Sequence, residues 1–109
     1  MIHNQYQEVM NNTKWEEIRE AMLDSPNGHP WRTKNIETGY ICPWDGEWFY
    51  HFRIGGHKCT EWLEIKSETE EIRNEVLEIL KGIHVPGEVL DGVIRVYGYV
   101  EIGKSVDYL

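Results

Sequence analysis

An aromatic run over residues 44–53, where five of ten residues are Trp, Tyr or Phe, limits most strongly which folds this chain can adopt. In a strand, side chains alternate between the two faces of a sheet. Trp48, Tyr50 and Phe52 would then lie on one face and Phe49 on the other. A core on one side of a sheet needs large apolar groups on one face only. The surplus of rings therefore predicts either a binding surface or a sheet that is covered on both sides.

The chain is 109 residues long and acidic, with a formal net charge of −8. This length fits one domain with one core. The charge would repel a phosphate backbone, which argues against nucleic acid as a partner, and it favours solubility and association with a basic protein. The sequence has no apolar run long enough for a membrane span, and its first residues lack the features of a secretory signal. We therefore expect a cytoplasmic protein that does not bind membranes.

Two helices are predicted, at residues 13–24 and 67–83, because each starts with Ser or Thr followed three residues later by Glu. In such a capping box the two side chains bond the free backbone N–H groups of the first turn. The second helix also carries a clear apolar stripe opposite its acidic residues. Residues 1–9 show no period, so we expect a disordered extension followed by a single domain over residues 10–109.

Turn residues divide the rest of the chain into five short strands, which we predict at residues 31–36, 40–42, 47–53, 59–66 and 93–102. The links between the first four are too short for a crossover, so these strands should form an antiparallel meander. The segment 85–92 is expected to be irregular. The predicted fold is α+β, with an antiparallel sheet of about five strands and two helices in the order α-β-β-β-β-α-β.

Alternation along these strands predicts two different sheet faces. The aliphatic side chains fall on one face, which suits the second helix. Trp62, Tyr97 and Tyr99 fall on the other face among charged residues, and this mixture is typical of protein interfaces. In the competing interpretation the first helix covers this face through Trp15, and the rings belong to the core. The rarity of large exposed apolar patches on monomers favours the second interpretation.

Candidate chemistry is sparse. Cys42, His51, His57 and Cys59 lack the paired spacing of a structural zinc site, so we expect no bound metal. Both thiols should be reduced in the cytoplasm, and a disulfide between them is the alternative for a secreted chain. A catalytic thiolate–imidazole pair would need a third group to orient the ring. Because the nucleotide-binding, metalloprotease and serine-hydrolase motifs are also absent from the sequence, we expect no cofactor, no catalytic residues and no enzymatic activity.

Three segments, at residues 12–15, 31–34 and 44–52, resemble a small bacterial family of uncharacterised single-domain proteins. The resemblance covers residues 10–102 and implies no particular reaction. In size, acidity and aromatic content, the chain also resembles the immunity proteins that bacteria pair with secreted toxins. This second resemblance is one of composition, and it implies no functional residue.

We therefore predict a non-enzymatic protein-binding domain, with a basic protein such as a toxin domain as its partner. An acidic, aromatic surface would cover a basic site on that partner, and a homodimer through the same face is compatible with this function. The predicted binding residues are Trp44, Asp45, Trp48, Tyr50, Trp62, Tyr97 and Tyr99.

Two other functions stay open at this point. A small-molecule binding module would use a pocket between the sheet and the first helix, lined by Trp31, Tyr50 and His51. A small enzyme would use His51 or His57 together with a nearby carboxylate.

Overall fold

The computed structural model describes residues 5–109, and the described part of the chain contains two α-helices and two antiparallel sheets. The predicted α+β class is confirmed. In chain order the elements are β1 (Tyr6–Glu8), α1 (Asn12–Asp24), β2 (Trp31–Asn35), the short 3-10 helix η2 (His51–Arg53), β3 (Thr60–Lys66), α2 (Glu70–Ile83), β4 (Gly87–Leu90), β5 (Val93–Tyr97) and β6 (Tyr99–Glu101).

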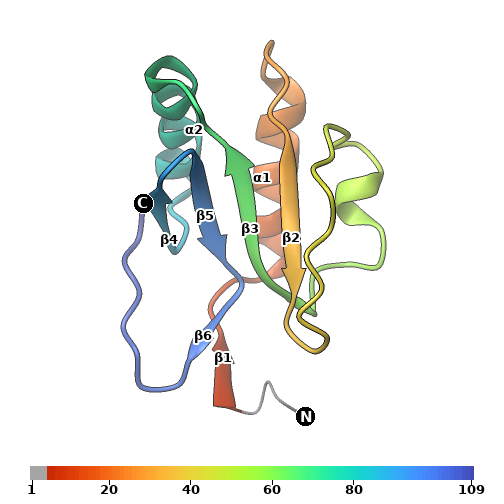
Figure 1. The fold of residues 1–109 in the computed structure, drawn as a ribbon, viewed down its shortest axis with the longest axis vertical. Helices are drawn as coiled ribbons and strands as arrows, with labels where there is room; N and C mark the ends of the chain where they lie inside the picture. The colour runs from red at the N-terminus through yellow and green to blue at the C-terminus, as the bar shows by residue number, and fades with distance from the viewer. Residues whose placement is uncertain (1–4) are drawn as a thin grey trace.

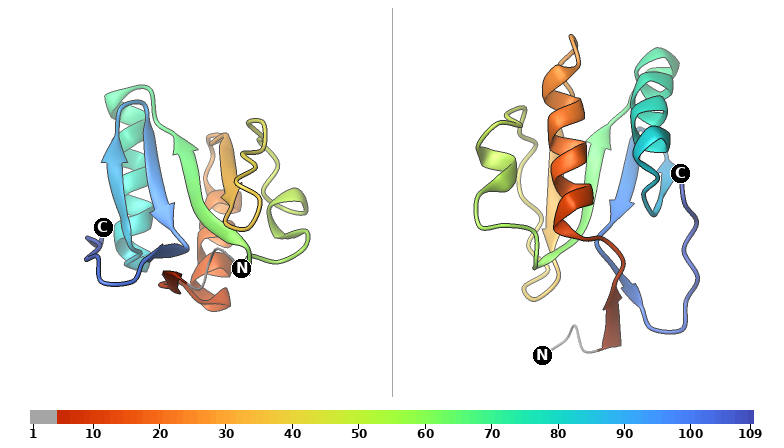
Figure 2. Two further views of the ribbon diagram at one scale, coloured as in Figure 1. Left: turned by 60° about the horizontal axis from the view of Figure 1, so that its bottom comes forward. Right: turned by 180° about the vertical axis from the view of Figure 1, so that it is seen from behind.

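The main sheet has the strand order β2-β3-β5-β4, with every neighbouring pair antiparallel. Both long helices pack on the same face of this sheet, as the view from behind in Figure 2 shows. Their buried side chains meet the inward-facing aliphatic residues of β3 and β5 in one core. This core includes Trp15, Ile18, Met22, Leu63, Ile65, Val76, Leu80, Ile94 and Val96.

Both helices start at a different cap from the one predicted. Asn11 caps α1, since its side chain accepts the backbone N–H of Lys14 at 2.9 Å. Thr69 caps α2 by accepting the N–H of Ile72 at 3.2 Å. Asn is at least as good an N-cap as Thr, which explains the earlier start of α1. Ser67 does not cap α2, because its hydroxyl donates to the carbonyl of Ile65 and its N–H donates to the carbonyl of Gly92.

The strand predicted over residues 47–53 is wrong, because this segment forms a turn followed by η2. The Glu47 carboxylate accepts the backbone N–H groups of Phe49, Tyr50 and His51 at 2.8, 2.9 and 2.6 Å. A local side-chain acceptor thus takes the donors that a strand would offer to a neighbour. The rings then follow a helical spacing, with Trp48 and Phe52 in the core and Phe49 and Tyr50 exposed.

The other strand predictions need smaller corrections. Residues 40–42 make only an isolated bridge from Ile41 to Lys34, which covers the outer edge of β2. The segment predicted to be irregular contains β4, which pairs with β5 through the Asp91-Gly92 turn. This two-residue connection is a typical hairpin turn, with Gly92 in the left-handed conformation (φ 76°).

The predicted last strand, residues 93–102, is broken at Gly98 into β5 and β6. A second, two-stranded sheet pairs β6 with β1 (Figure 1). Tyr6–Glu8 therefore forms a strand, which differs from the disordered extension expected for residues 1–9. Residues 1–4 of that extension lie outside the described residues.

Candidate functional site

One face of the main sheet carries no helix, because α1 and α2 both pack on the other (Figures 1 and 2). The hypothesis that the first helix covers the aromatic face through Trp15 is wrong, since Trp15 lies in the core with Leu63 and Ile65. We call the opposite surface the helix-free face. The strand registers place on it Arg32, Lys34, Trp62, Glu64, Lys66, Glu88, Arg95 and Tyr97.

A row of alternating charges crosses all four strands of this face. Arg32 on β2 lies opposite Glu64 on β3, which lies opposite Arg95 on β5, which in turn lies opposite Glu88 on β4. The Glu64 carboxylate is the centre of the row. It accepts Nε of Arg32 at 2.9 Å on one oxygen, and Nε and Nη2 of Arg95 at 3.0 and 2.6 Å on the other. Its side chain is only 3% exposed, so the charge is buried but doubly paired.

Indole rings lie against the cations of this row. The guanidinium carbon of Arg32 and the ammonium of Lys66 lie 4.6 and 4.9 Å from the centre of the Trp44 ring. The guanidinium carbon of Arg95 lies 4.5 Å from the centre of the Trp62 ring. These are cation–π distances. The charged and aromatic side chains therefore hold one another in place on a surface that no helix covers.

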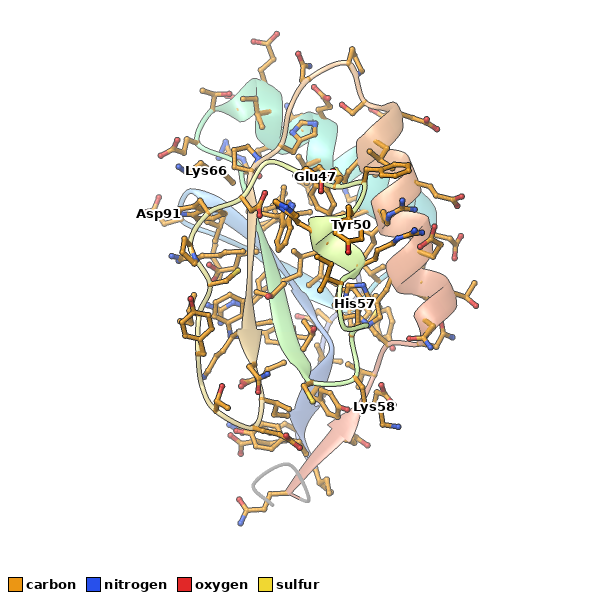
Figure 3. All side chains as sticks on the ribbon, turned by 90° about the vertical axis from the view of Figure 1, so that its right-hand side faces the viewer. Glu47, Tyr50, His57, Lys58, Lys66 and Asp91 are labelled. Atoms are coloured by element: carbon orange, nitrogen blue, oxygen red, sulfur yellow. The ribbon has the colours of Figure 1, made fainter. Side chains whose placement is uncertain are left out.

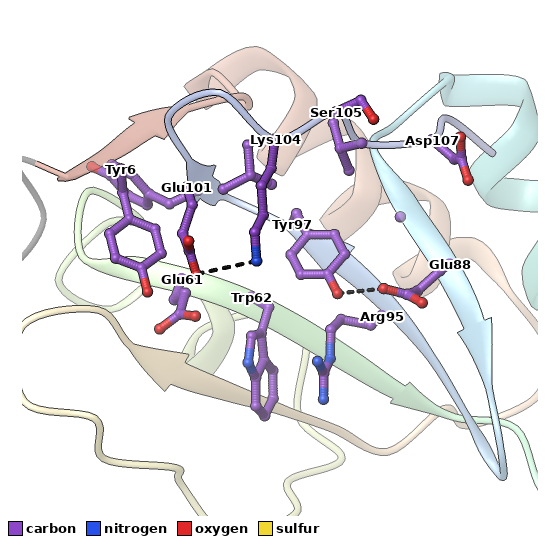
Figure 4. Close-up of a pocket in the computed structure, with 14 residues that line it drawn as sticks. Tyr6, Glu61, Trp62, Glu88, Arg95, Tyr97, Glu101, Lys104, Ser105 and Asp107 are labelled. Atoms are coloured by element: carbon purple, nitrogen blue, oxygen red, sulfur yellow. Dashed lines mark hydrogen bonds and ion pairs between the residues drawn. The ribbon is translucent and has the colours of Figure 1, made fainter.

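A hollow of about 350 Å³ lies beside Arg95, between the helix-free face and the C-terminal segment 102–109 (Figure 4). Two backbone bonds attach this segment to the chain ahead of β5. The N–H of Gly87 donates to the carbonyl of Asp107, and that of Leu109 to the carbonyl of Val85, both at 2.9 Å. Four rings and four carboxylates line the hollow, from Tyr6, Trp62, Tyr97, Tyr99, Glu61, Glu88, Glu101 and Asp107.

Tyr97 and Tyr99 line this hollow in different ways. The Tyr97 hydroxyl donates to the Glu88 carboxylate, and burial together with that bond raises the pKa of Tyr97. The Tyr99 hydroxyl donates to the carbonyl of Lys58 at 2.5 Å, and its ring is nearly buried. Tyr97 therefore offers a ring to a ligand, whereas Tyr99 contributes a wall.

The structure separates the seven predicted binding residues into three groups. Trp62, Tyr97 and Tyr99 meet at the hollow, where Trp62 and Tyr99 are nearly buried and Tyr97 is the more exposed ring, and Trp44 lies on the same face over Arg32. Asp45 and Tyr50 belong to the segment between β2 and β3, where Tyr50 is 58% exposed at the side of the molecule seen in Figure 3. Trp48 lies in the core, and its indole N–H donates to the carbonyl of His29. We therefore do not retain Trp48 as a binding residue.

Sequence reasoning did not find the charged partners at this site. Glu64 and Arg95 alternate in the expected way along their strands, but only the strand register shows that Glu64 lies between two arginines. The carboxylates at the hollow come from β3, from β4 and from the C-terminal stretch (Glu61; Glu88; Glu101 and Asp107). A spacing rule cannot detect such a set, because the fold alone brings its members together.

Within residues 5–109, the side chains predicted to line a pocket between the sheet and the first helix are placed differently. Trp31 is buried there and packs against Trp48 and Phe52, with ring centres 5.8 and 5.2 Å away. His51 lies outside this core, where its Nδ1–H donates to Asp45 at 2.9 Å. The hydrogen bond from the Glu47 N–H is the largest cause that lowers the pKa of Asp45, and the bond from His51 lowers it further. This arrangement fixes the turn rather than lining a cavity.

His57 is placed between aromatic rings. Its ring lies 4.9 Å from that of Trp15 and 4.7 Å from that of Phe52 (centre to centre). Burial lowers the pKa of His57 to about 4, although the charge of Glu16 acts in the opposite direction. The imidazole is therefore neutral near pH 7.

Ser25, His29 and Glu75 form a cluster that contains the residue types of a hydrolase triad. In a triad the acid bonds the imidazole nitrogen that faces away from the serine. Here Ser25 Oγ and Glu75 Oε1 both lie 3.0 Å from Nε2 of His29, and the Ser25 hydroxyl donates to Glu75 at 2.8 Å. The bond from Ser25 is the largest cause that lowers the pKa of Glu75. The cluster thus attaches the loop after α1 to α2.

Cys42 and Cys59 are free thiols that line a second hollow with Lys58. The chain at β2 runs between them. The N–H of Cys42 donates to the carbonyl of Thr33, and the N–H of Ile36 donates to the carbonyl of Cys59. Within residues 5–109, no three histidine, cysteine or acidic side chains are grouped so that they could hold a metal ion. No helix of the described part is long and apolar enough to cross a membrane.

The fold and the site define a small α+β domain whose antiparallel sheet has one helix-covered and one helix-free face. The chain belongs to DUF6678, a family of unknown function, which it matches over residues 1–103. The expected membership of an uncharacterised family is confirmed, while its bacterial origin and the likeness to immunity proteins stay predictions. No curated protein and no solved structure matches the chain significantly.

Proposed function

We propose that this chain is a non-enzymatic binding domain that holds a basic protein partner against its helix-free face. The observation that carries the proposal is the pre-ordered set of rings and charges on that face, from Trp44 at one end to the hollow beside Tyr97 at the other. Interfaces are enriched in Trp, Tyr and Arg, and side chains that are already fixed lose little entropy on binding.

Charge supports a basic partner at the hollow end of the face, because the strands of the face itself carry more cations (Arg32, Lys34, Lys66 and Arg95) than carboxylates (Glu64 and Glu88). The chain carries a formal net charge of −8, and the hollow is lined by four carboxylates against the two cations Arg95 and Lys104. Such a field speeds encounter with a positive surface and disfavours acidic partners. A basic toxin domain covered by an immunity-type inhibitor in the cytoplasm of a bacterium has the required chemistry, and we propose it as the class of partner.

The test is a pull-down from the source organism with the tagged chain, followed by titration of the purified partner. Trp44→Ala and Tyr97→Ala remove two rings of the helix-free face. Phe49→Ala is the matched control, because Phe49 is an exposed ring (60%) in the segment between β2 and β3. We expect the two face variants to lose the partner and the control to retain it. Loss in the control alone would move the interface to that segment, and self-association in place of a partner would identify a homodimer.

A second candidate function is the binding of a small molecule in the hollow beside Tyr97. Its volume of about 350 Å³ lies at the lower end of the range for ligand pockets. A ligand that raises the melting temperature of the wild type, but not that of Tyr97→Ala, would favour this candidate over protein binding.

A further inference from the structure

The helix-free face holds its own two arginines in one repeated way. The guanidinium of Arg95 lies over the Trp62 ring and donates to Glu64 at 3.0 and 2.6 Å. The guanidinium of Arg32 lies over the Trp44 ring and donates to the other oxygen of Glu64 at 2.9 Å. Each guanidinium therefore lies over an indole ring and donates to a carboxylate. This pairing suits the fork of N–H donors that a guanidinium presents.

The hollow beside Arg95 offers the same two components again. Figure 4 shows the rings of Tyr6 and Tyr97 around it, with the carboxylates of Glu61 and Glu101 between them. Arg95 is already paired with Glu64, and Glu61 is paired with Lys34 at 3.4 Å. Glu101 is therefore the carboxylate of this pair whose own ion pair is most exposed to solvent. A volume of about 350 Å³ is large enough for one long side chain and small for a larger ligand.

Lys104 shows where a cation fits in this hollow. Its ammonium lies 3.5 Å from a Glu101 oxygen and points into the hollow in Figure 4, although the side chain is 69% exposed. An ion pair so exposed to water is weak and is readily exchanged. A guanidinium that bonds a carboxylate through two N–H groups and contacts a ring has more interactions than this ammonium.

We propose that the hollow receives one arginine side chain of the basic partner, and that this arginine displaces Lys104 from Glu101. The proposal rests on the proposed function, because it names the group through which the partner is recognised. It can be tested without the partner, since the hollow should bind an isolated arginine derivative.

The probe is Nα-acetyl-L-arginine amide, titrated into the full chain and followed by NMR of the backbone amides. Nα-acetyl-L-citrulline amide is the matched uncharged control, and the corresponding lysine amide tests for an ammonium. We expect saturable shifts around Tyr97, Glu101 and Lys104 with the arginine amide, weaker binding of the lysine amide and none of the citrulline amide. One side chain should bind in the millimolar range.

Three variants make the test specific. Glu101→Gln should lower the affinity for the arginine amide about tenfold, since it removes one charge-assisted hydrogen bond. Lys104→Ala should strengthen binding several-fold, because the competing ammonium is lost. Glu20→Gln makes the same charge change on the exposed face of α1 and should leave the affinity unchanged. All three positions are exposed, so the amide spectra should show an intact fold in each variant.

Equal binding of the citrulline amide, absence of saturable binding, or weaker binding by Lys104→Ala would each overturn the arginine site. If Glu20→Gln weakened binding of the arginine amide as much as Glu101→Gln does, long-range charge would explain the effect, and the arginine site would be overturned. None of these outcomes affects the proposed function, which is tested separately by the loss of partner binding in Trp44→Ala and Tyr97→Ala. If the arginine amide binds but no protein partner is found, the hollow stands as a cation site and the proposed function fails.

Discussion

At the residue scale, the buried carboxylate of Glu64 forms ion pairs with two guanidinium groups, those of Arg32 and Arg95. Glu64→Gln keeps the size of the side chain but leaves Arg32 and Arg95 facing each other without a negative charge. We expect the free energy of unfolding to fall by about 2 kcal/mol, less than for a fully buried pair because both arginines are partly exposed. Urea unfolding at pH 7 measures this loss.

The control for this prediction is Glu88→Gln, at the exposed end of the same row. That change should cost less than about 0.5 kcal/mol, as is usual for surface substitutions. Equal losses in the two variants would mean that the buried position of Glu64 has no special role.

His57 gives the protein a pH-dependent stability. Burial against Trp15 and Phe52 holds the pKa of His57 at about 4, below its ordinary 6.5. Between these values the unfolded chain binds a proton that the folded chain does not, so stability is lost as the pH falls from about 6.5 to about 4. The difference corresponds to at most about 3 kcal/mol.

His57→Phe should keep the ring packing and remove this part of the pH dependence. Chemical unfolding of wild type and variant between pH 4 and pH 7 measures the difference. The pKa values of the Asp45, Glu47 and Glu75 carboxyl groups are also lowered, from ordinary values of 3.8 for Asp and 4.5 for Glu. The stability that these carboxylates contribute is therefore lost mostly at a pH below this window. Parallel stability curves for the two proteins would show that His57 is not the responsible group.

At the scale of elements, Gly98 allows the chain to leave the main sheet and join the second one. A Cβ at this position would lie 2.1 Å from the backbone oxygen of Thr60 and 3.1 Å from the Trp15 ring. Gly98→Ala must therefore move the backbone at residue 98 away from Thr60 on β3, and it also crowds the Trp15 ring. We expect a loss of about 1–3 kcal/mol, the usual cost of overpacking.

Gly82 in α2 is the matched comparison, since nothing lies within 4 Å of the position of its Cβ. Gly82→Ala should raise stability by about 0.5–1 kcal/mol through helix propensity. Thermal unfolding of the two alanine variants should therefore show shifts of opposite sign. A neutral result at Gly98 would mean that the strands can move apart at no cost.

At the scale of the whole molecule, the net charge of −8 should govern the rate of association with a basic partner. Raising the ionic strength from about 0.02 M to 0.5 M shortens the screening length from roughly 20 Å to a few ångströms. We expect the association rate constant to fall by about tenfold or more, while the dissociation rate constant changes less. Stopped-flow measurements test this, and an association rate constant independent of salt would contradict an acidic binding surface.

The α+β class, both long helices, and the alternation that separates aliphatic from mixed faces in β3 and β5 could be predicted from the sequence. These features depend on local spacing, and burial follows directly from that spacing when the element is regular. The aromatic run at residues 44–53 failed the same test. Read as a strand, this segment would place rings on both faces, but the Glu47 carboxylate accepts three nearby N–H groups and the segment forms a turn instead.

Which side of the sheet stays free of helices, and which side chains meet there, depends on tertiary packing. The Glu64 row needs the register of four strands, and the hollow needs the C-terminal segment to return beside β4. Trp48 and Tyr97 are both large aromatic residues in the sequence, yet one is core and the other lines the hollow. The physical reason is that contacts between distant segments depend on how the elements pack, and residue spacing along the chain carries no record of that packing.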